Sequence, residues 1–137
     1  MFYVTYRKPK KISNSLMDNM VKFASNFLQI DGEMEVHFDG EFNDKCCGYV
    51  EYEPDYDEIV VYINPSYNRQ EIITTFFHEM VHVKQYLKGE LQHSCGKSLS
   101  RWNGKSYDVS YYELPWEMEA FELECIMYDI FKQEGFK

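Results

Sequence analysis

Residues 68–89 read NRQEIITTFFHEMVHVKQYLKG and predict one long amphipathic helix. Asn68 followed by Glu71 at the third position is typical of a helix N-terminus, because each residue can satisfy a free backbone amide of the other. The apolar residues gather on the side opposite His78, whereas His82 lies on the same side as His78. These apolar residues are Ile72, Ile73, Phe76, Met80, Val83 and Leu87. The helix therefore has an apolar back, which suits packing on a sheet, and a polar front.

The polar front carries the motif HEMVH at residues 78–82. Residues four apart project from the same side of a helix, so His78 and His82 can bind one metal ion together. Glu79 is then placed to act as a general base on a water at that metal. The alternative is an ordinary pair of surface histidines. The apolar back of the helix favours the metal site, and nitrogen ligands favour zinc as the metal.

A catalytic zinc site usually has three protein ligands, so a third is needed. The final helix, expected over residues 114–132, is rich in glutamate. Glu119 lies close to its apolar stripe, where a carboxylate needs a partner, and is the predicted third ligand. Glu117, on the other flank of the stripe, is one alternative. His93, with Cys95 beside it in the preceding loop, is another.

The length and composition of the chain limit its number of domains, its binding partners and its cellular compartment. The chain of 137 residues predicts a single domain over residues 1–137, and its hydrophobic content of 45% is enough for a core. A net charge of −9 disfavours direct binding to nucleic acid or to anionic membranes. No segment has the pattern of a secretory signal or the length of a membrane span. The four cysteines lack C-x-x-C spacing, so we expect a cytoplasmic protein without a disulfide framework.

The order of the expected elements predicts an α+β fold. A helix is expected over residues 12–30, with Ser13 as its N-cap, because apolar residues recur there at helical spacing. Alternating or β-branched runs predict strands over residues 2–6, 34–38, 48–53 and 58–63. Residues 91–112 are irregular and predict a long functional loop, with a short strand pair around residues 102–105. Strands thus come early, and two helices that carry the chemistry come late.

Three segments resemble zinc metallopeptidases of the zincin fold, in particular the gluzincin branch. They are HEMVHVKQY at residues 78–86, WNGKSY at residues 102–107 and PWEMEAF at residues 115–121. More narrowly, the chain is similar to small metallopeptidase-like proteins that are common in phage genomes. SprT-like and ImmA/IrrE-like peptidases are more distant relatives.

The resemblance implies a small zincin-like domain in which a mixed or antiparallel sheet and an N-terminal helix precede the HExxH helix. It implies zinc on His78 and His82, Glu79 as the base, and Glu119 of the Glu-Ala pair as the third ligand. It also implies that the strand near residues 59–63 borders the cleft. In a phage protein, the compartment would be the host cytoplasm.

These expectations lead to a hypothesis of zinc-dependent peptide-bond hydrolysis, with a protein or peptide as the substrate. A group that stabilises the oxyanion is also required, and the sequence leaves Tyr107, Tyr111, Tyr112 and His93 as candidates. A different class of function is a zinc-stabilised module that binds a partner protein without turnover. The sequence predicts neither the cleavage preference nor the oligomeric state.

Overall fold

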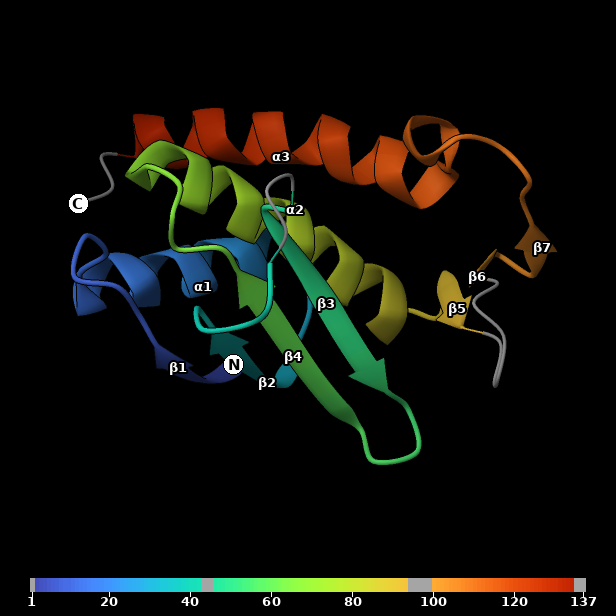
Figure 1. The fold of residues 1–137 in the computed structure, drawn as a ribbon, viewed down its shortest axis with the longest axis horizontal. Coiled ribbons are helices and arrows are strands. Elements are labelled where there is room, and N and C mark those ends of the chain that lie inside the picture. The colour runs from blue at the N-terminus through green and yellow to red at the C-terminus, as the bar shows by residue number, and fades with distance from the viewer. Residues whose placement is uncertain (1, 43–45, 94–99, 135–137) are drawn as a thin grey trace.

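The computed structural model describes residues 2–42, 46–93 and 100–134, with residues 2, 3 and 93 described by their backbone alone (Figure 1). Within these ranges the chain forms three α-helices and two β-sheets. The expectation of an α+β fold is therefore confirmed. Cys95, one of the alternative metal ligands, lies outside the described residues.

The larger sheet has four strands in the order β1-β2-β4-β3. The strands are β1 (Phe2–Arg7), β2 (Gly32–His37), β3 (Gly48–Glu53) and β4 (Glu58–Ile63). Strands β1, β2 and β4 run parallel, whereas β3 pairs antiparallel with β4 and forms one edge. The hairpin between β3 and β4 turns at residues 54–57, as the sequence predicts. The sheet is thus mixed, and its antiparallel edge strand is β3.

The helices begin and end close to the predicted residues. They are α1 (Asn14–Leu28), α2 (Arg69–Leu87) and α3 (Pro115–Gln133). The Ser13 hydroxyl accepts a hydrogen bond from the Leu16 amide at 3.0 Å, and the Asn68 side chain accepts one from the Glu71 amide at 2.9 Å. Both N-caps therefore satisfy amides that a helix start leaves free. None of the described helices is long and apolar enough to cross a bilayer.

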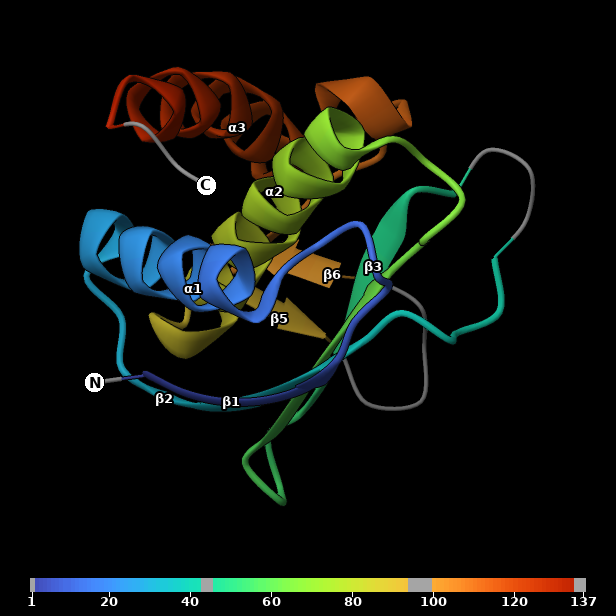
Figure 2. The ribbon, with the colours of Figure 1, turned by 90° about the vertical axis from the view of Figure 1, so that its left-hand side faces the viewer.

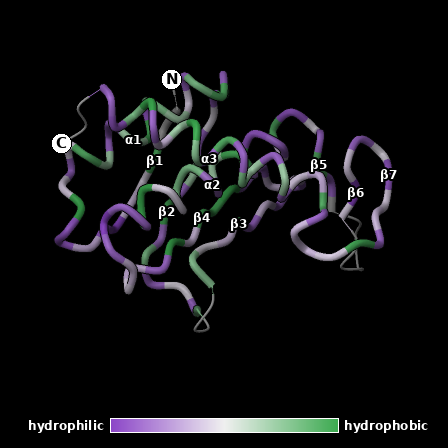
Figure 3. The backbone as a smooth tube through the Cα atoms, turned by 90° about the horizontal axis from the view of Figure 1, so that it is seen from above, coloured by the Kyte–Doolittle hydropathy of each residue, from purple (hydrophilic) through white to green (hydrophobic). Residues whose placement is uncertain are grey.

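The elements stack in three layers, which Figure 2 shows from the side. Helices α1 and α2 lie on one face of the four-stranded sheet, and α3 lies on the far side of α2. Alternate strand residues such as Val36 and Val61 are buried beneath the helices. Along the backbone, hydrophobic residues alternate with hydrophilic ones, as expected of elements that bury only one side (Figure 3). Helix α2 is therefore enclosed between the sheet and α3.

Residues 91–112 contain more regular structure than the sequence predicts. Strands β5 (Leu91–His93), β6 (Ser100–Trp102) and β7 (Lys105–Ser106) form a small antiparallel sheet, and η1 (Tyr111–Glu113) is a 3₁₀ turn. Asn103 and Gly104 have φ of 49° and 83°, which suits a tight two-residue hairpin turn between β6 and β7. The expected strand pair is confirmed, whereas β5 and η1 lie where the sequence predicts loop. Short strands of mixed polarity carry too weak a periodicity to be recognised.

Candidate metal centre

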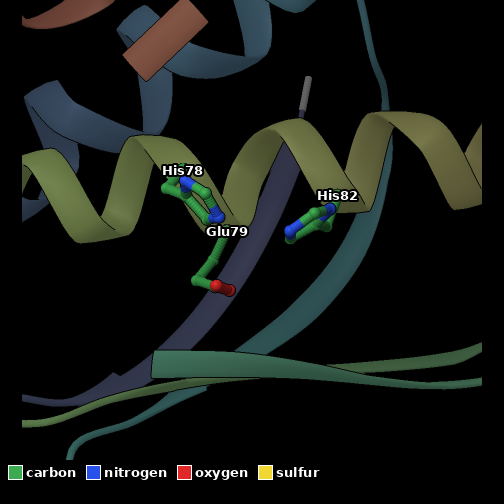
Figure 4. A group of neighbouring side chains, drawn as sticks. All are labelled: His78, Glu79 and His82. Atoms are coloured by element: carbon green, nitrogen blue, oxygen red, sulfur yellow. The ribbon is translucent and has the colours of Figure 1, made fainter. Parts of the chain in front are cut away.

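Helix α2 brings together the three residues of the HExxH motif. His78, Glu79 and His82 are buried, and one potential ligand atom from each lies within 4.8 Å of the other two. The histidine rings lie one turn apart on the same side of the helix (Figure 4). The carboxylate of Glu79 extends from the same stretch of helix toward strand β3. The sequence prediction that these residues share one site is consistent with this geometry.

The two imidazoles converge on one carboxylate of α3. Nε2 of His78 lies 3.0 Å and Nε2 of His82 lies 3.2 Å from Oε1 of Glu117. Two ligands of one tetrahedral zinc ion, each about 2.0–2.1 Å from it, are about 3.3 Å apart. The distance from Glu117 Oε1 to each Nε2 is therefore close to the separation of two ligands on one ion. Glu117 is the carboxylate that the structure brings to both histidines.

The other ring nitrogen of each histidine has its own partner. Nδ1–H of His78 donates to Oε1 of Glu124 at 2.9 Å, and Nδ1–H of His82 donates to Oε1 of Gln85 at 2.8 Å. Such partners hold a metal-binding histidine in the tautomer whose other nitrogen has a free lone pair. Both Nε2 atoms are thus directed at the point that Glu117 also faces.

Glu119, the third ligand predicted from the sequence, makes its hydrogen bonds away from the histidines in this structure. Its Oε1 accepts hydrogen bonds from Nζ of Lys84 at 2.7 Å and from Nε2 of Gln85 at 2.9 Å. Residues two apart on a helix project about 200° apart, so Glu117 and Glu119 lie on opposite flanks of α3. This carboxylate near the apolar stripe does have a partner, as the sequence predicts. The partner is a buried lysine and an amide.

Glu124 and Gln85, which hydrogen-bond to the histidines, are not among the site residues predicted from the sequence. Glu117 and Glu124 are seven residues apart, so they share one face of α3. That spacing shows that the two glutamates act from one flank, whereas the packing of α3 against α2 decides that this flank faces the histidines. His93, another alternative ligand, ends strand β5, and its side chain is outside what the structure describes.

The negative charges of the carboxylates at the site would be balanced by a bound cation. Three carboxylates, Glu79, Glu117 and Glu124, surround two imidazoles in a buried environment. Burial disfavours the imidazolium, but hydrogen bonds to Glu117 and Glu124 outweigh it and raise the pKa of His78 to about 10. Burial likewise opposes ionisation of Glu117, yet its hydrogen bonds to both histidines lower its pKa to about 2. Without a metal, protons on the imidazoles supply the positive charge that a metal ion would supply.

Glu79 is buried, and one of its carboxylate oxygens has no protein partner among the described residues. Its Oε2 is buried and has no hydrogen-bond partner among the described residues, which is uncommon for a carboxylate. Burial raises the pKa of Glu79, and the neighbouring histidines only partly offset this effect. A buried carboxylate of raised pKa beside a metal site has the character of a general base.

A cavity of about 330 Å³ opens beside Glu79 and His82. Its further lining residues are Gly48, Tyr49 and Val50 of β3 together with Tyr86, Leu91, Ser100, Tyr111, Trp116 and Glu117. The strand of the four-stranded sheet that borders the cavity is therefore β3, and the expectation that residues 59–63 border it is wrong. Strand β4 is paired on both sides, whereas β3 is the edge. An edge strand can face a ligand with backbone groups that have no partner strand.

Gly48 allows β3 to approach α2 closely. A Cβ at this position would lie 2.6 Å from the backbone oxygen of Tyr62, 3.0 Å from a side-chain carbon of Thr75 and 3.4 Å from Cγ of Glu79. Only a residue without a side chain fits between a neighbouring strand and the helix at this distance. Glycine therefore lets the edge strand lie directly against the base of the site.

Tyr111 is the hydroxyl group that the structure places at the site. Its OH donates to Oε1 of Glu117 at 2.9 Å, and its side chain lines the cavity. Burial and the negative charge of Glu117 raise its pKa, so the hydroxyl keeps its proton at neutral pH. Tyr112 is 72% exposed, and Tyr107 packs its ring against Trp116. Of the three tyrosines considered from the sequence, Tyr111 alone contacts a residue of the metal centre.

Comparisons with protein-family models, with curated proteins and with solved structures found no match to this chain.

Proposed function

We propose that the chain is a zinc-dependent peptidase, with His78, His82 and Glu117 as metal ligands and Glu79 as general base. One observation carries the proposal. Two imidazole nitrogens converge on one carboxylate, while a fourth residue, Glu79, lines the adjoining cavity and has a buried carboxylate oxygen without a hydrogen-bond partner among the described residues. A closed structural zinc site has four protein ligands and no use for such a base.

Each residue has a distinct role in the proposed reaction. A zinc ion at this site would polarise the scissile carbonyl and lower the pKa of water. Glu79 accepts a proton from the attacking water and then delivers it to the leaving amine. Glu124 and Gln85 orient the two histidines. The Tyr111 hydroxyl is the group best placed to donate a hydrogen bond to the carbonyl oxygen as negative charge develops on it.

The edge strand β3 offers a place for an extended peptide. It borders the cavity through Gly48 and Val50, and on its other side it is paired with β4. A peptide that adds to such an edge gains backbone hydrogen bonds and passes the reactive groups. This arrangement supports a peptide, rather than a compact small molecule, as the substrate.

Cleavage of an unbiased peptide library, followed by mass spectrometry, tests the proposal. We expect the zinc-loaded chain to cleave peptides and a chelator to abolish the cleavage. Replacement Glu79→Gln should retain zinc, because Glu79 is not a ligand, and should lower the rate about 100-fold or more. Undiminished cleavage by this variant would refute the mechanism. Zinc binding without any cleavage across the library would instead support a zinc-stabilised binding module.

A further inference from the structure

A network of buried polar side chains connects His82 to residues on the far flank of α3. Gln85 is fully buried, with 0% of its surface exposed, and lies one turn after His82 on α2. Its Oε1 accepts from Nδ1–H of His82 at 2.8 Å. Its Nε2 donates to the backbone oxygen of Trp116 at 3.0 Å and to Oε1 of Glu119 at 2.9 Å. Both hydrogens of the amide and its oxygen are therefore engaged.

These contacts fix the orientation of the Gln85 amide. Rotation by 180° would direct the amide nitrogen at His82 and the amide oxygen at two acceptors, the Trp116 carbonyl and the Glu119 carboxylate. The three hydrogen bonds of the amide would be lost. The amide N–H group would then face the N–H group of His82, and the amide oxygen would face two other oxygens. The amide therefore keeps its oxygen on the histidine. An acceptor at Nδ1 requires that this nitrogen carry a proton, so a metal ion that binds His82 would displace the proton on Nε2 and use the lone pair there.

Glu119 is itself held in place by Lys84. The lysine is buried and contacts Glu119 at 2.7 Å and Glu90, which precedes β5, at 2.8 Å. A buried ammonium ion requires such partners, so Lys84 fixes the position of the carboxylate. The Glu119 carboxylate in turn accepts from Gln85 on the side away from the histidine. The chain of contacts runs from Lys84 through Glu119 and Gln85 to His82.

We propose that Gln85 and Glu119 are positioning residues that hold His82 in the Nδ1–H tautomer and so direct its Nε2 at the metal. This inference rests on the proposed function only in that the held histidine is a zinc ligand. It assigns a role to Glu119 that differs from metal binding. The two histidines then differ in how they are held, because Nδ1 of His78 contacts only the carboxylate of Glu124.

The test compares three variants with a matched control. Gln85→Met keeps the volume of the side chain and removes its hydrogen bonds, and Glu119→Ala removes the group that fixes the amide. Glu119→Gln keeps an oxygen that can accept from Gln85. Glu90→Ala is the control, because Glu90 and Glu119 both bind Lys84 and both side chains are 30% exposed. Far-UV circular dichroism confirms the fold of each variant.

Two measurements decide the outcome, namely zinc affinity by competition with a chromophoric chelator and the ring N–H signal of His82 in ¹⁵N NMR. We expect Gln85→Met and Glu119→Ala to weaken zinc binding about 10–100-fold, the usual range for partners of metal ligands. Their Nδ1–H signal should lose its protection from solvent exchange. Glu119→Gln should restore most of the affinity, and Glu90→Ala should leave both measurements unchanged.

The inference is overturned if Gln85→Met and Glu119→Ala keep the affinity and the protected signal of the unaltered chain. It is also overturned if Glu90→Ala weakens zinc binding as much as Glu119→Ala, since the effect would then come from Lys84 rather than from Gln85. Failure of the unaltered chain to bind zinc would refute the proposed function. In that case the ring N–H signal, measured on the metal-free protein, still decides whether Gln85 and Glu119 position His82.

Discussion

Two glutamates of α3, two residues apart, have different environments and different roles. Glu117 is buried and contacts both histidines, whereas Glu119 is partly exposed and contacts Lys84 and Gln85. The pattern of hydropathy around a helix shows how far a residue lies from the apolar stripe. It does not show which side of the stripe faces the histidines of the neighbouring helix. The position of α2 against α3 decides this question, and it depends on tertiary packing. The pair of histidines could therefore be predicted from sequence, but the carboxylate that lies beside them could not.

The assignment of Glu117 predicts a large and specific loss of zinc affinity. Glu117→Ala removes a direct ligand, so its loss should exceed the about 10–100-fold expected for partners of ligands. Glu122→Ala, an exposed glutamate on the same helix, is the control and should bind zinc like the unaltered chain. Isothermal titration calorimetry measures both. Near-normal zinc affinity of Glu117→Ala would show that another group completes the site.

At the scale of the elements, the contact between α2 and α3 assembles the site. Ala120 of α3 is fully buried there, and its small side chain allows the helices to lie close together. The long helices and the main strands could be predicted because each has a strong periodicity and clear end signals, such as Ser13 and Asn68. Strand β5 and the order of the sheet could not, because pairing between distant strands leaves no local pattern. The edge position of β3 was missed for this reason.

Enlarging Ala120 should disturb the fold and the metal centre together. Ala120→Leu adds volume to a packed contact, so we expect a loss of about 1–3 kcal/mol in the free energy of unfolding. Separation of α3 from α2 would also move Glu117 and lower zinc affinity. Urea denaturation and chelator competition measure the two effects. Met118→Leu, at a position that is 57% exposed, provides the control, and it should change neither quantity.

For the whole molecule, the stability of the metal-free chain should depend on pH in a characteristic way. The pKa of His78 is raised from 6.5 to about 10, so its contribution is complete below pH 6.5 and is lost as the pH rises through about 10. The pKa of Glu117 is lowered from 4.5 to about 2, so its contribution is present above pH 4.5 and is lost as the pH falls through about 2. The metal-free chain should therefore be most stable between pH 4.5 and 6.5.

Zinc should reverse the alkaline part of this dependence. Zinc competes with protons for the histidines, so its stabilising effect should increase as the pH rises above 6.5. Zinc at 100 times its dissociation constant should add about 2.7 kcal/mol to the free energy of unfolding. Thermal melts with zinc or with a chelator, recorded across this pH range, test the prediction. A metal-free chain that becomes more stable between pH 6.5 and 10 would contradict it.

The close approach of β3 at Gly48 has a consequence for the recognition of relatives. Any side chain at this position would collide with the backbone oxygen of Tyr62, which cannot move without breaking the hairpin. A homologue that keeps the base at Glu79 should therefore keep glycine at the position of Gly48, however far the rest of its sequence has diverged. Glycine in the edge strand, HExxH in the next helix and paired glutamates at the positions of Glu117 and Glu124 together form a search signature. This signature can separate true relatives from chains that contain HExxH by chance.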